Sequence, residues 1–249
     1  MNQLSKYPHL NRYVSNLKSI PGGTYRFGFS KDQTRAAPRI TISSFRMGAT
    51  PVTWGMWKEY CKAESVRSEY GPHLPEDSGW GYPDNHPVVN VSWEDIMYRY
   101  PGGFCKWASG VAGFKLTLPT DAQWEYAARG GKDGLEYPWG NNFDKSKLWF
   151  DTTTDKTAAV DRTDRIYRNG YGLTDMVGNV WQWCADYYND DYRPAGKDPV
   201  DTQKIIARCV RGGSHYYINP DYFRCAHRDW FIPDTRFSNL GFRLSAGPK

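Results

Sequence analysis

Hydrophobic and polar residues alternate in two short segments near the start of the chain, a pattern typical of strands with one buried face. The first covers residues 24–29 (TYRFGF) after a Pro-Gly-Gly turn, and the second covers residues 39–45 (RITISSF). From residue 54 to about 63 the apolar residues recur at helical spacing, which predicts a helix capped by Thr53. Residues 64–90 are broken repeatedly by Pro and Gly, and we expect a long ordered loop there.

Two more helices are indicated by their capping residues. Ser92 has the character of an N-cap, and carboxylates follow it in the first turn, where the helix dipole favours them. We expect this helix to break at residues 101–103 (PGG) and to resume over 104–108. Thr120 and Gln123 form a capping box before a third helix, which should end at the glycine pair that follows.

The second half of the chain has almost no helical periodicity. After residue 132, short segments lie between Gly, Asn, Asp and Pro, and no internal repeat is present. We therefore predict a single α+β domain over residues 18–249, preceded by an N-terminal extension at 1–17. The chain has 249 residues, 16% of them aromatic, with 24 Gly and 16 Pro. This composition excludes a helical bundle and predicts loops with large rigid side chains packed between them.

Charge, hydropathy and cysteine content limit the kinds of partner and the cellular environment that the sequence allows. The net charge of +5 is scattered, so nucleic-acid binding is not expected. The sequence has no apolar run of about 18 residues, so we expect no membrane span, and residues 1–17 lack the apolar core of a secretory signal. Five cysteines without a Cys-x-x-Cys pattern argue against a zinc ribbon or a thioredoxin-type site. A reduced cytoplasmic setting is the simplest interpretation, and virion or surface display through a partner is the alternative.

Familiar catalytic motifs are missing from the sequence. It contains no Gly-x-Ser-x-Gly, no phosphate-binding loop and no His-Glu-x-x-His, and its five histidines show no metal-ligand spacing. A stronger signal is a series of phrases in a fixed order: 85–95 (NHPVVNVSWED), 116–131 (LTLPTDAQWEYAARGG), 137–140 (YPWG), 169–183 (NGYGLTDMVGNVWQW), 211–214 (RGGS), 224–228 (RCAHR) and 239–243 (NLGFR).

In this order the phrases resemble the formylglycine-generating-enzyme (sulfatase-modifying-factor) family over residues 18–246. The resemblance implies an α+β, C-type lectin-like fold with much irregular structure. Six tryptophans of the predicted scaffold should then pack the core: Trp93, Trp107, Trp124, Trp139, Trp181 and Trp183.

The resemblance also implies specific chemistry, which this chain matches only in part. The oxidase of the family uses two cysteines that hold copper, placed between its Gly-Gly-Ser and Arg-Cys-Ala phrases. Residues 215–223 contain no cysteine, so two soft thiolates cannot converge on Cu(I) there, and we expect no enzymatic activity. Iron-binding relatives use a His triad that lies partly in a helical domain that is absent here. Cys225 resembles a structural cysteine whose disulfide partner would fall at Ala128, so it should be a free thiol.

Calcium is the remaining metal that the resemblance suggests. Its ligands would be the side chains of Asp175 and Gln182 and the backbone carbonyls of Gly178 and Val180. The family has a glutamate where Gln182 stands, so the site has lost a charge, and a second family site looks lost at Lys147. The alternative is a tight turn of the same shape held by hydrogen bonds alone. No cofactor is required by any prediction made from the sequence.

The C-terminal part of the chain has a composition of its own. Residues 205–248 contain no Lys and no Glu, and eight of the 28 residues in 215–242 are aromatic. Aromatic anchors among small hydrogen-bonding residues are typical of a protein-binding surface, and an aromatic-rich core is the alternative. The predicted ligand-binding residues are His215, Tyr216, Tyr217, Asn219, Asp221, Tyr222, Phe223, His227, Asp229, Trp230, Phe231, Thr235, Phe237 and Ser238.

The same region resembles the variable region of proteins diversified by retroelements, a branch of which shares this lectin fold. The resemblance rests on constant blocks that contain Arg211, Arg224, Arg228, Arg236 and Arg243, with residues reachable from asparagine codons between them. It implies a prokaryotic or viral, non-enzymatic binding protein whose variable region, about 211–243, recognises a macromolecule, first of all a protein. An oxidase of the family and a non-catalytic paralogue with one invariant partner are the alternatives. The oligomeric state is not indicated.

Overall fold

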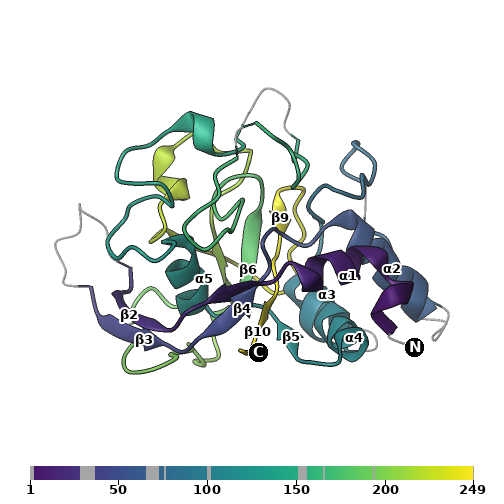
Figure 1. Ribbon diagram of the computed structural model, residues 1–249, viewed down its shortest axis with the longest axis horizontal. Coiled ribbons are helices and arrows are strands. Elements are labelled where there is room, and N and C mark those ends of the chain that lie inside the picture. The colour runs from purple at the N-terminus through teal and green to yellow at the C-terminus, as the bar shows by residue number, and fades with distance from the viewer. Residues whose placement is uncertain are drawn as a thin grey trace.

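The computed structural model describes residues 3–28, 37–65, 73–75, 77–99, 102–150, 156–164, 166–192 and 194–248 (Figure 1). Phe29 and Pro101, at the edges of two predicted elements, lie outside these ranges. The described helices are η1 (Gln3–Lys6), α1 (Pro8–Ser15), α2 (Trp54–Ser65), α3 (Trp93–Met97), α4 (Gly103–Ala112), α5 (Asp121–Ala128), η2 (Lys145–Lys147) and η3 (Pro220–Phe223). The described strands are β1 (Lys18–Ile20), β2 (Gly23–Arg26), β3 (Arg39–Ile42), β4 (Phe45–Met47), β5 (Leu116–Thr117), β6 (Trp181–Tyr187), β7 (Arg208–Arg211), β8 (Arg228–Phe231), β9 (Leu240–Gly241) and β10 (Ser245–Ala246).

Three small sheets organise the domain. One has the strand order β1-β4-β10-β5, the second is the β2-β3 pair, and the third has the order β8-β7-β6-β9. Strands from both ends of the chain pair with β4, since Met47 lies opposite both Lys18 and Ser245. Helices α1 to α4 gather on one side of the molecule and the β2-β3 pair lies on the other (Figure 1). The predicted α+β class with much irregular structure is confirmed.

The β8-β7-β6-β9 sheet separates two hydrophobic cores. Side chains alternate along β6, so Trp181 and Trp183 face the core that contains the helices α2 and α4. There Trp57 stacks on Phe104 with ring centroids 5.4 Å apart. Cys184 faces the second core, which α5 covers. Of the six scaffold tryptophans, five are buried and Trp139 is half-buried, so aromatic side chains do fill this fold as predicted.

Local signals in the sequence fixed most helix starts correctly. Ser92 caps α3 and Thr120 caps α5, each through a complete capping box. The helix predicted over 104–108 is longer, because α4 runs from Gly103 to Ala112 and buries its apolar residues to Val111. Gly103 has φ of +80°, and a Cβ there would lie 2.6 Å from the carbonyl oxygen of Ile96, so only glycine fits.

The strand predicted over 39–45 is divided in two. Between β3 and β4 the carboxylate of Asp198 accepts hydrogen bonds from the amide and hydroxyl of Ser43, at 2.7 and 2.6 Å. These bonds take the place of ladder bonds at this point and separate the two strands. The sequence pattern showed the alternation, but this partner lies 155 residues away.

The N-terminal segment, predicted to be an extension, is packed into the fold from residue 3 onward. Leu10 on α1 is fully buried, and the Tyr13 hydroxyl accepts a hydrogen bond from the Leu244 amide at 3.0 Å. The amides of His9 and Leu10, which have no partner within the helix, donate to the carboxylate of Glu59 on α2, at 2.8 and 3.0 Å. The polar composition of this segment concealed the apolar stripe of a short amphipathic helix. None of the described helices has the length and apolarity that crossing a bilayer requires.

Replacing Leu10 with Ala tests whether α1 belongs to the domain. We expect the free energy of unfolding to fall by about 2–4 kcal/mol, because the change removes buried methyl groups and leaves a cavity. Urea denaturation measures this, and Ser15→Ala on the exposed side of α1 is the control, with an expected change within about 0.5 kcal/mol. Equal stability of the two variants would show that α1 is dispensable.

Candidate functional site

The C-terminal aromatic residues lie on a floor made by β6. Trp181 and Trp183 are two residues apart on this strand, so both point to the same side of the sheet, and both are fully buried. Their positions are fixed by hydrogen bonds: the Trp181 amide donates to the Asn239 carbonyl at 2.8 Å, and the Trp183 indole donates to the Val91 carbonyl at 3.1 Å. The floor is therefore rigid where the aromatic residues rest on it.

A first group of rings packs on Trp181. The centroids of Tyr217, Tyr222 and His227 lie 5.8, 6.1 and 5.9 Å from the indole. Tyr217 and Tyr222 are themselves 4.4 Å apart, and Tyr216 extends the group outward at 5.8 Å from Tyr217. Tyr216 is 58% exposed, so the group runs from a buried base to a solvated edge.

A second group packs on Trp183. Phe231 lies 6.2 Å from the indole, and Phe237 lies 5.1 Å from Phe231 with 45% of its surface exposed. Asp229 is two residues before Phe231 on β8 and therefore shares the side of the strand on which Phe231 lies. We call Tyr216, Tyr217, Tyr222, His227, Asp229, Phe231 and Phe237 the aromatic face.

The other predicted binding residues fall into several environments. Asn219 caps η3 and Asp221 lies within it, and both are exposed, whereas Thr235 and Ser238 are half-buried near Phe237 in the sequence. Trp230 is exposed, but it alternates with Phe231 on β8 and therefore points to the opposite side of the sheet, where it packs against Tyr188 at 6.4 Å. The prediction that all of these residues share one face is wrong for Trp230.

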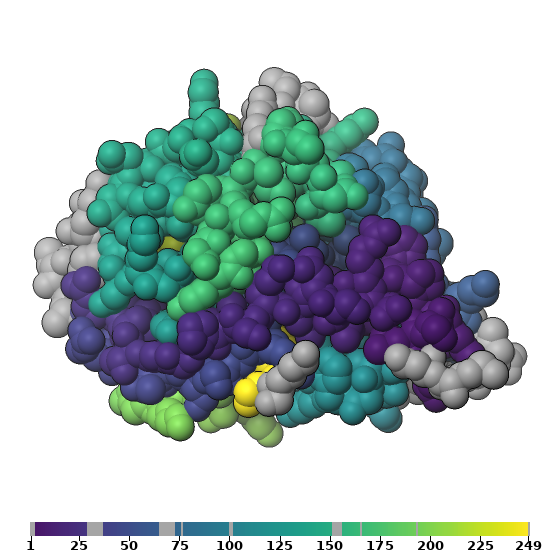
Figure 2. Space-filling model, in the orientation of Figure 1, coloured from purple at the N-terminus to yellow at the C-terminus, as the bar shows by residue number. Residues whose placement is uncertain are grey.

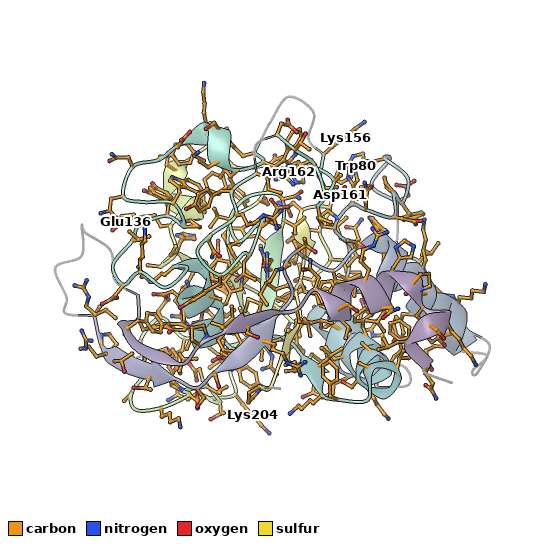
Figure 3. All side chains as sticks on the ribbon, in the orientation of Figure 1. Trp80, Glu136, Lys156, Asp161, Arg162 and Lys204 are labelled. Carbon is orange, nitrogen blue, oxygen red and sulfur yellow. The ribbon has the colours of Figure 1, made fainter. Side chains whose placement is uncertain are left out.

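His215 and Phe223 need a second correction, since both are fully buried. The His215 ring lies 2.8 Å from the Asn179 carbonyl through Nδ1 and is covered by Trp80, 5.7 Å away (labelled in Figure 3). Phe223 packs on Phe143 in the second core. Both are structural residues, because the chain turns inward at these two points.

Two exposed residues were missed. Ile218 is 68% exposed and Ile232 is 41% exposed, each within the C-terminal aromatic region. The sequence search selected aromatic and hydrogen-bonding residues and passed over isoleucine. Their position between aromatic residues, in a segment without Lys or Glu, was the available signal.

A buried arginine holds the backbone beneath the face. The guanidinium of Arg211 contacts the carboxylates of Asp121 and Glu125 on α5, the second at 2.9 Å. It also donates to the carbonyls of Cys225 and His227, at 2.8 and 3.0 Å. Burial opposes its charge, but the two carboxylates outweigh burial and raise the pKa of Arg211 well above its usual value.

Other arginines of the constant blocks have similar roles. Arg228 pairs with Asp121 at 2.8 Å and donates to the Asn189 carbonyl at 3.0 Å. Arg243 is fully buried and donates to three backbone carbonyls, those of Gly48, Thr174 and Asp175, and to the side chain of Gln182. Arg211, Arg228 and Arg243 thus anchor irregular backbone through hydrogen bonds to carbonyls.

The residues predicted to bind calcium are arranged around a guanidinium. Both carboxylate oxygens of Asp175 accept hydrogen bonds from Arg162, which is labelled in Figure 3, at 2.6 and 2.9 Å. The Gln182 amide nitrogen donates to the Asp175 carbonyl at 2.8 Å, and its oxygen accepts from Trp124 and Arg243. A calcium ion needs these oxygens free, so the side chains as placed do not fit it. Calcium binding by Asp175, Gly178, Val180 and Gln182 stays an untested prediction.

The thiol groups of the cysteines have little exposure to solvent. All five cysteines are free and buried, and burial raises the pKa of Cys225 to about 12. Cys184, Cys209 and Asp121 lie within 4.8 Å of one another, but the Asp121 carboxylate already pairs with Arg211 and Arg228. The described cysteines do not form the copper pair of the family, because residues 215–223 contain none.

This architecture defines the class of the protein, which is a lectin-like domain of the formylglycine-generating type. It carries an aromatic face over a tryptophan floor. Residues 7–246 match the Sulfatase-modifying factor enzyme 1-like domain, and the chain belongs to this family. Its sequence is 36% identical to the "Formylglycine-generating enzyme" of Thermomonospora curvata, over 96% of this chain and 82% of the relative. It is 35% identical to the mouse "Inactive C-alpha-formylglycine-generating enzyme 2", over 91% of this chain and 84% of the relative.

Solved structures confirm the fold. Treponema denticola variable protein 1 matches with a TM-score of 0.74 at 23% identity, over 93% of this chain and 95% of that one. PvdO from Pseudomonas aeruginosa matches with a TM-score of 0.78 at 22% identity, over 93% and 94%. These two likenesses, both below 25% identity, concern the fold.

The sequence analysis predicted that this protein is not an enzyme, and the sequence relatives correct this prediction. The family to which it belongs contains proteins named formylglycine-generating enzymes, at identities up to 36% among those compared. The missing cysteine pair was evidence about one metal site only, and it was wrongly extended to the class of the protein.

Acid should destabilise the aromatic face through His227. Burial, Arg211 and Arg224 lower the pKa of His227 to about 4. An unfolded histidine takes up its proton near pH 6.5, so lowering the pH from 6.5 to 4 stabilises the unfolded chain, by up to about 3 kcal/mol. Urea denaturation across this range should show a shallower loss of stability for His227→Phe than for the wild type. His73→Gln, at an exposed position, should keep the wild-type slope. Parallel slopes for the wild type and His227→Phe would contradict this assignment.

Replacing Arg162 with Met tests what holds the 175–182 turn. The change leaves the buried Asp175 carboxylate without its cation, and we expect a loss of about 3–5 kcal/mol in the free energy of unfolding. Arg99→Met, which removes an exposed ion pair with Glu94, should cost at most about 1 kcal/mol. Calcium should leave the wild-type denaturation midpoint unchanged, and a midpoint that rises with calcium and falls with a chelator would establish the ion instead.

Proposed function

We propose that this protein is a ligand-binding member of its family and that the aromatic face, with Asn219 and Ser238 at its border, recognises a macromolecule, specifically a protein. The observation that carries the proposal is the position of the face. Its rings rest on Trp181 and Trp183, yet Tyr216 and Phe237 keep about half of their surface in solvent. A monomeric domain gains little from leaving large rings so exposed, whereas a binding surface gains contact area.

The chemistry of the face suits a protein ligand. Tyrosine and phenylalanine give large contact areas at a low cost in rotamer entropy, and Asn219 and Asp229 add hydrogen-bonding groups. Residues 205–248 contain no Lys, so the face lacks the flexible cations that a phosphate backbone attracts. Interfaces between proteins are similarly enriched in aromatic residues and depleted of Lys and Glu.

Diversification of the face is the finer part of the proposal. Its support is the sequence frame together with the way in which the structure divides the region. Arg211 and Arg243 are fixed by several buried hydrogen bonds each, while no residue of the aromatic face is buried. Substitutions at the face therefore alter the surface without removing anchors. The likeness in fold to a protein named variable protein 1 is consistent with this assignment.

The names of the sequence relatives support a second candidate, formylglycine generation. Oxygen uptake that depends on a cysteine-containing peptide would establish that activity. The two candidates are compatible, because a protein substrate could bind the same face.

Combined replacement of Tyr216 and Phe237 with Ala should abolish recognition while leaving the fold intact. The exposed rings contribute little to stability, so the change in unfolding free energy should stay within about 1 kcal/mol. Each ring at the centre of an interface contributes at least about 1 kcal/mol, so affinity should fall more than about tenfold. The immobilised protein is incubated with extracts of the source organism and of organisms that live beside it. The amount of each protein that it captures is then measured.

Tyr98→Ala is the matched control, since Tyr98 is 67% exposed and belongs to α3's C-terminal end rather than to the face. A protein that is retained by the wild type and by Tyr98→Ala, but lost by the double variant, is a ligand of the face. Equal retention by all three chains would contradict the proposal. Sequencing the gene in related isolates tests the finer part, which fails if substitutions do not concentrate between the constant arginine blocks.

A further inference from the structure

A second hollow lies apart from the aromatic face. It has a volume of about 240 Å³, and none of its walls comes from residues 215–238. Figure 2 shows it as the depression where the purple atoms of α1 meet the green atoms of residues near 160–175. The lining residues are His9, Arg12, Tyr13, Asn16, Ala49, Thr50, Thr53, Met56, Asp84, Asn85, Val160, Asp161, Arg168 and Thr174.

One wall of this cavity is a single face of α1. His9, Arg12, Tyr13 and Asn16 follow the spacing i, i+3, i+4, i+7, which places them in line along the helix. Seven residues of helix rise by about 10 Å, so this wall has two distinct ends. The helix is held in place by its bonds to Glu59 and by the buried Leu10, so the wall is preformed.

The end near His9 carries carboxylates. His9 Nε2 lies 3.7 Å from the carboxylate of Asp84, which also pairs with Lys58 at 2.8 Å. The neighbouring Asn85 donates its side-chain amide to Asp161 at 2.9 Å, and its carbonyl accepts the Val160 amide at 2.8 Å. Among the described residues, Asp161 has this amide donor and no ion pair, so its charge is available to a ligand.

The end near Asn16 carries arginine. The segment 168–174 reaches this end of α1, because the Thr174 amide donates to the Ala49 carbonyl at 2.8 Å and Gly172 faces Lys18. Both Arg168 and Arg12 are exposed, and neither pairs with a carboxylate in the part of the chain that the structure describes. The Arg168 guanidinium is therefore available to bind an anion at this end, and Arg12, one helical turn before Asn16, offers a second guanidinium.

The lining also includes apolar side chains, those of Tyr13, Ala49, Met56 and Val160, beside the hydroxyls of three threonines. A ligand with only a negative charge would be repelled by Asp84 and Asp161 at one end. A ligand with only a positive charge would be repelled by the arginines at the other. A molecule with an ammonium at one end, a carboxylate at the other and an apolar part between them satisfies the whole lining.

We propose that this cavity binds a short zwitterion of the size of a dipeptide, with its ammonium toward Asp161 and its carboxylate toward Arg168 and Arg12. The size supports this class: the volume equals that of about eight water molecules and lies below the range of about 300–1,000 Å³ for drug-sized ligands. A dipeptide spans about 7 Å between its termini, which fits a wall of about 10 Å from which charged side chains reach inward.

Calorimetric titration of the full chain with alanyl-leucine tests the proposal. The free dipeptide should bind at concentrations below about 10 mM, while its N-acetylated form and its C-terminal amide should each bind at least about tenfold more weakly. Arg168→Gln should weaken the free dipeptide by about tenfold and leave the amide unchanged, since the amide has no carboxylate to lose. Asp161→Asn should show the converse selectivity, a loss for the free dipeptide and none for the N-acetylated form.

Arg39→Gln is the matched control, because Arg39 is an exposed arginine that lies outside the cavity lining, and it should bind as the wild type does. Absence of heat and of competition up to about 10 mM dipeptide would overturn the proposal. Equal binding of the free and N-acetylated dipeptides would overturn it as well, since the cavity would then be a simple anion site. None of these outcomes depends on the aromatic face, so its proposed role is tested separately.

Discussion

A single buried guanidinium connects the parts of this fold that have no regular structure to hold them. Arg211 ends β7, contacts two carboxylates of α5, and binds the carbonyls at 225 and 227 just before β8. A buried charge with only one partner would be costly, and here the four acceptors together offset the loss of water. The strand, the helix and the C-terminal loop therefore stabilise one another, because removing any of them leaves a buried charge incompletely paired.

This arrangement explains how an irregular surface can be both rigid and tolerant of change. A loop that is shaped by its own side chains changes its backbone when those side chains change. The segment 215–238 is instead held from beneath, by Arg211 through the carbonyls of Cys225 and His227, and by the indoles of Trp181 and Trp183. The outward side chains contribute contact area more than stability, so their identity is free to follow the ligand.

The sequence predicted what depends on neighbours in the chain. The N-cap at Ser92 and the capping box at Thr120 were predicted correctly because each motif is complete within four residues. The break at Ser43 was missed because its cause, Asp198, is remote in sequence. The composition indicated which segment carries the aromatic face, but it could not show to which side of the sheet each side chain points. Trp230 and Phe231 are adjacent and equally suited to a surface, and only the pairing of β8 with β7 shows that they point to opposite sides.

The turn at 175–182 shows the same limit for chemistry. Asp175 and Gln182 are residue types that bind calcium. The residue type alone does not reveal which protein groups these residues already contact. In the structure Arg162, from another segment, places a guanidinium with fixed geometry against the Asp175 carboxylate.

Asn179, in the same turn, accepts the His215 amide through its carbonyl and binds Ala158 and Asp175 through its side chain. The backbone under the aromatic face and the segment that forms one wall of the second cavity thus share one residue, held at a positive φ of 59°. Both surfaces depend on this turn keeping its shape, and the salt bridge between Arg162 and Asp175 is one of the contacts that hold it.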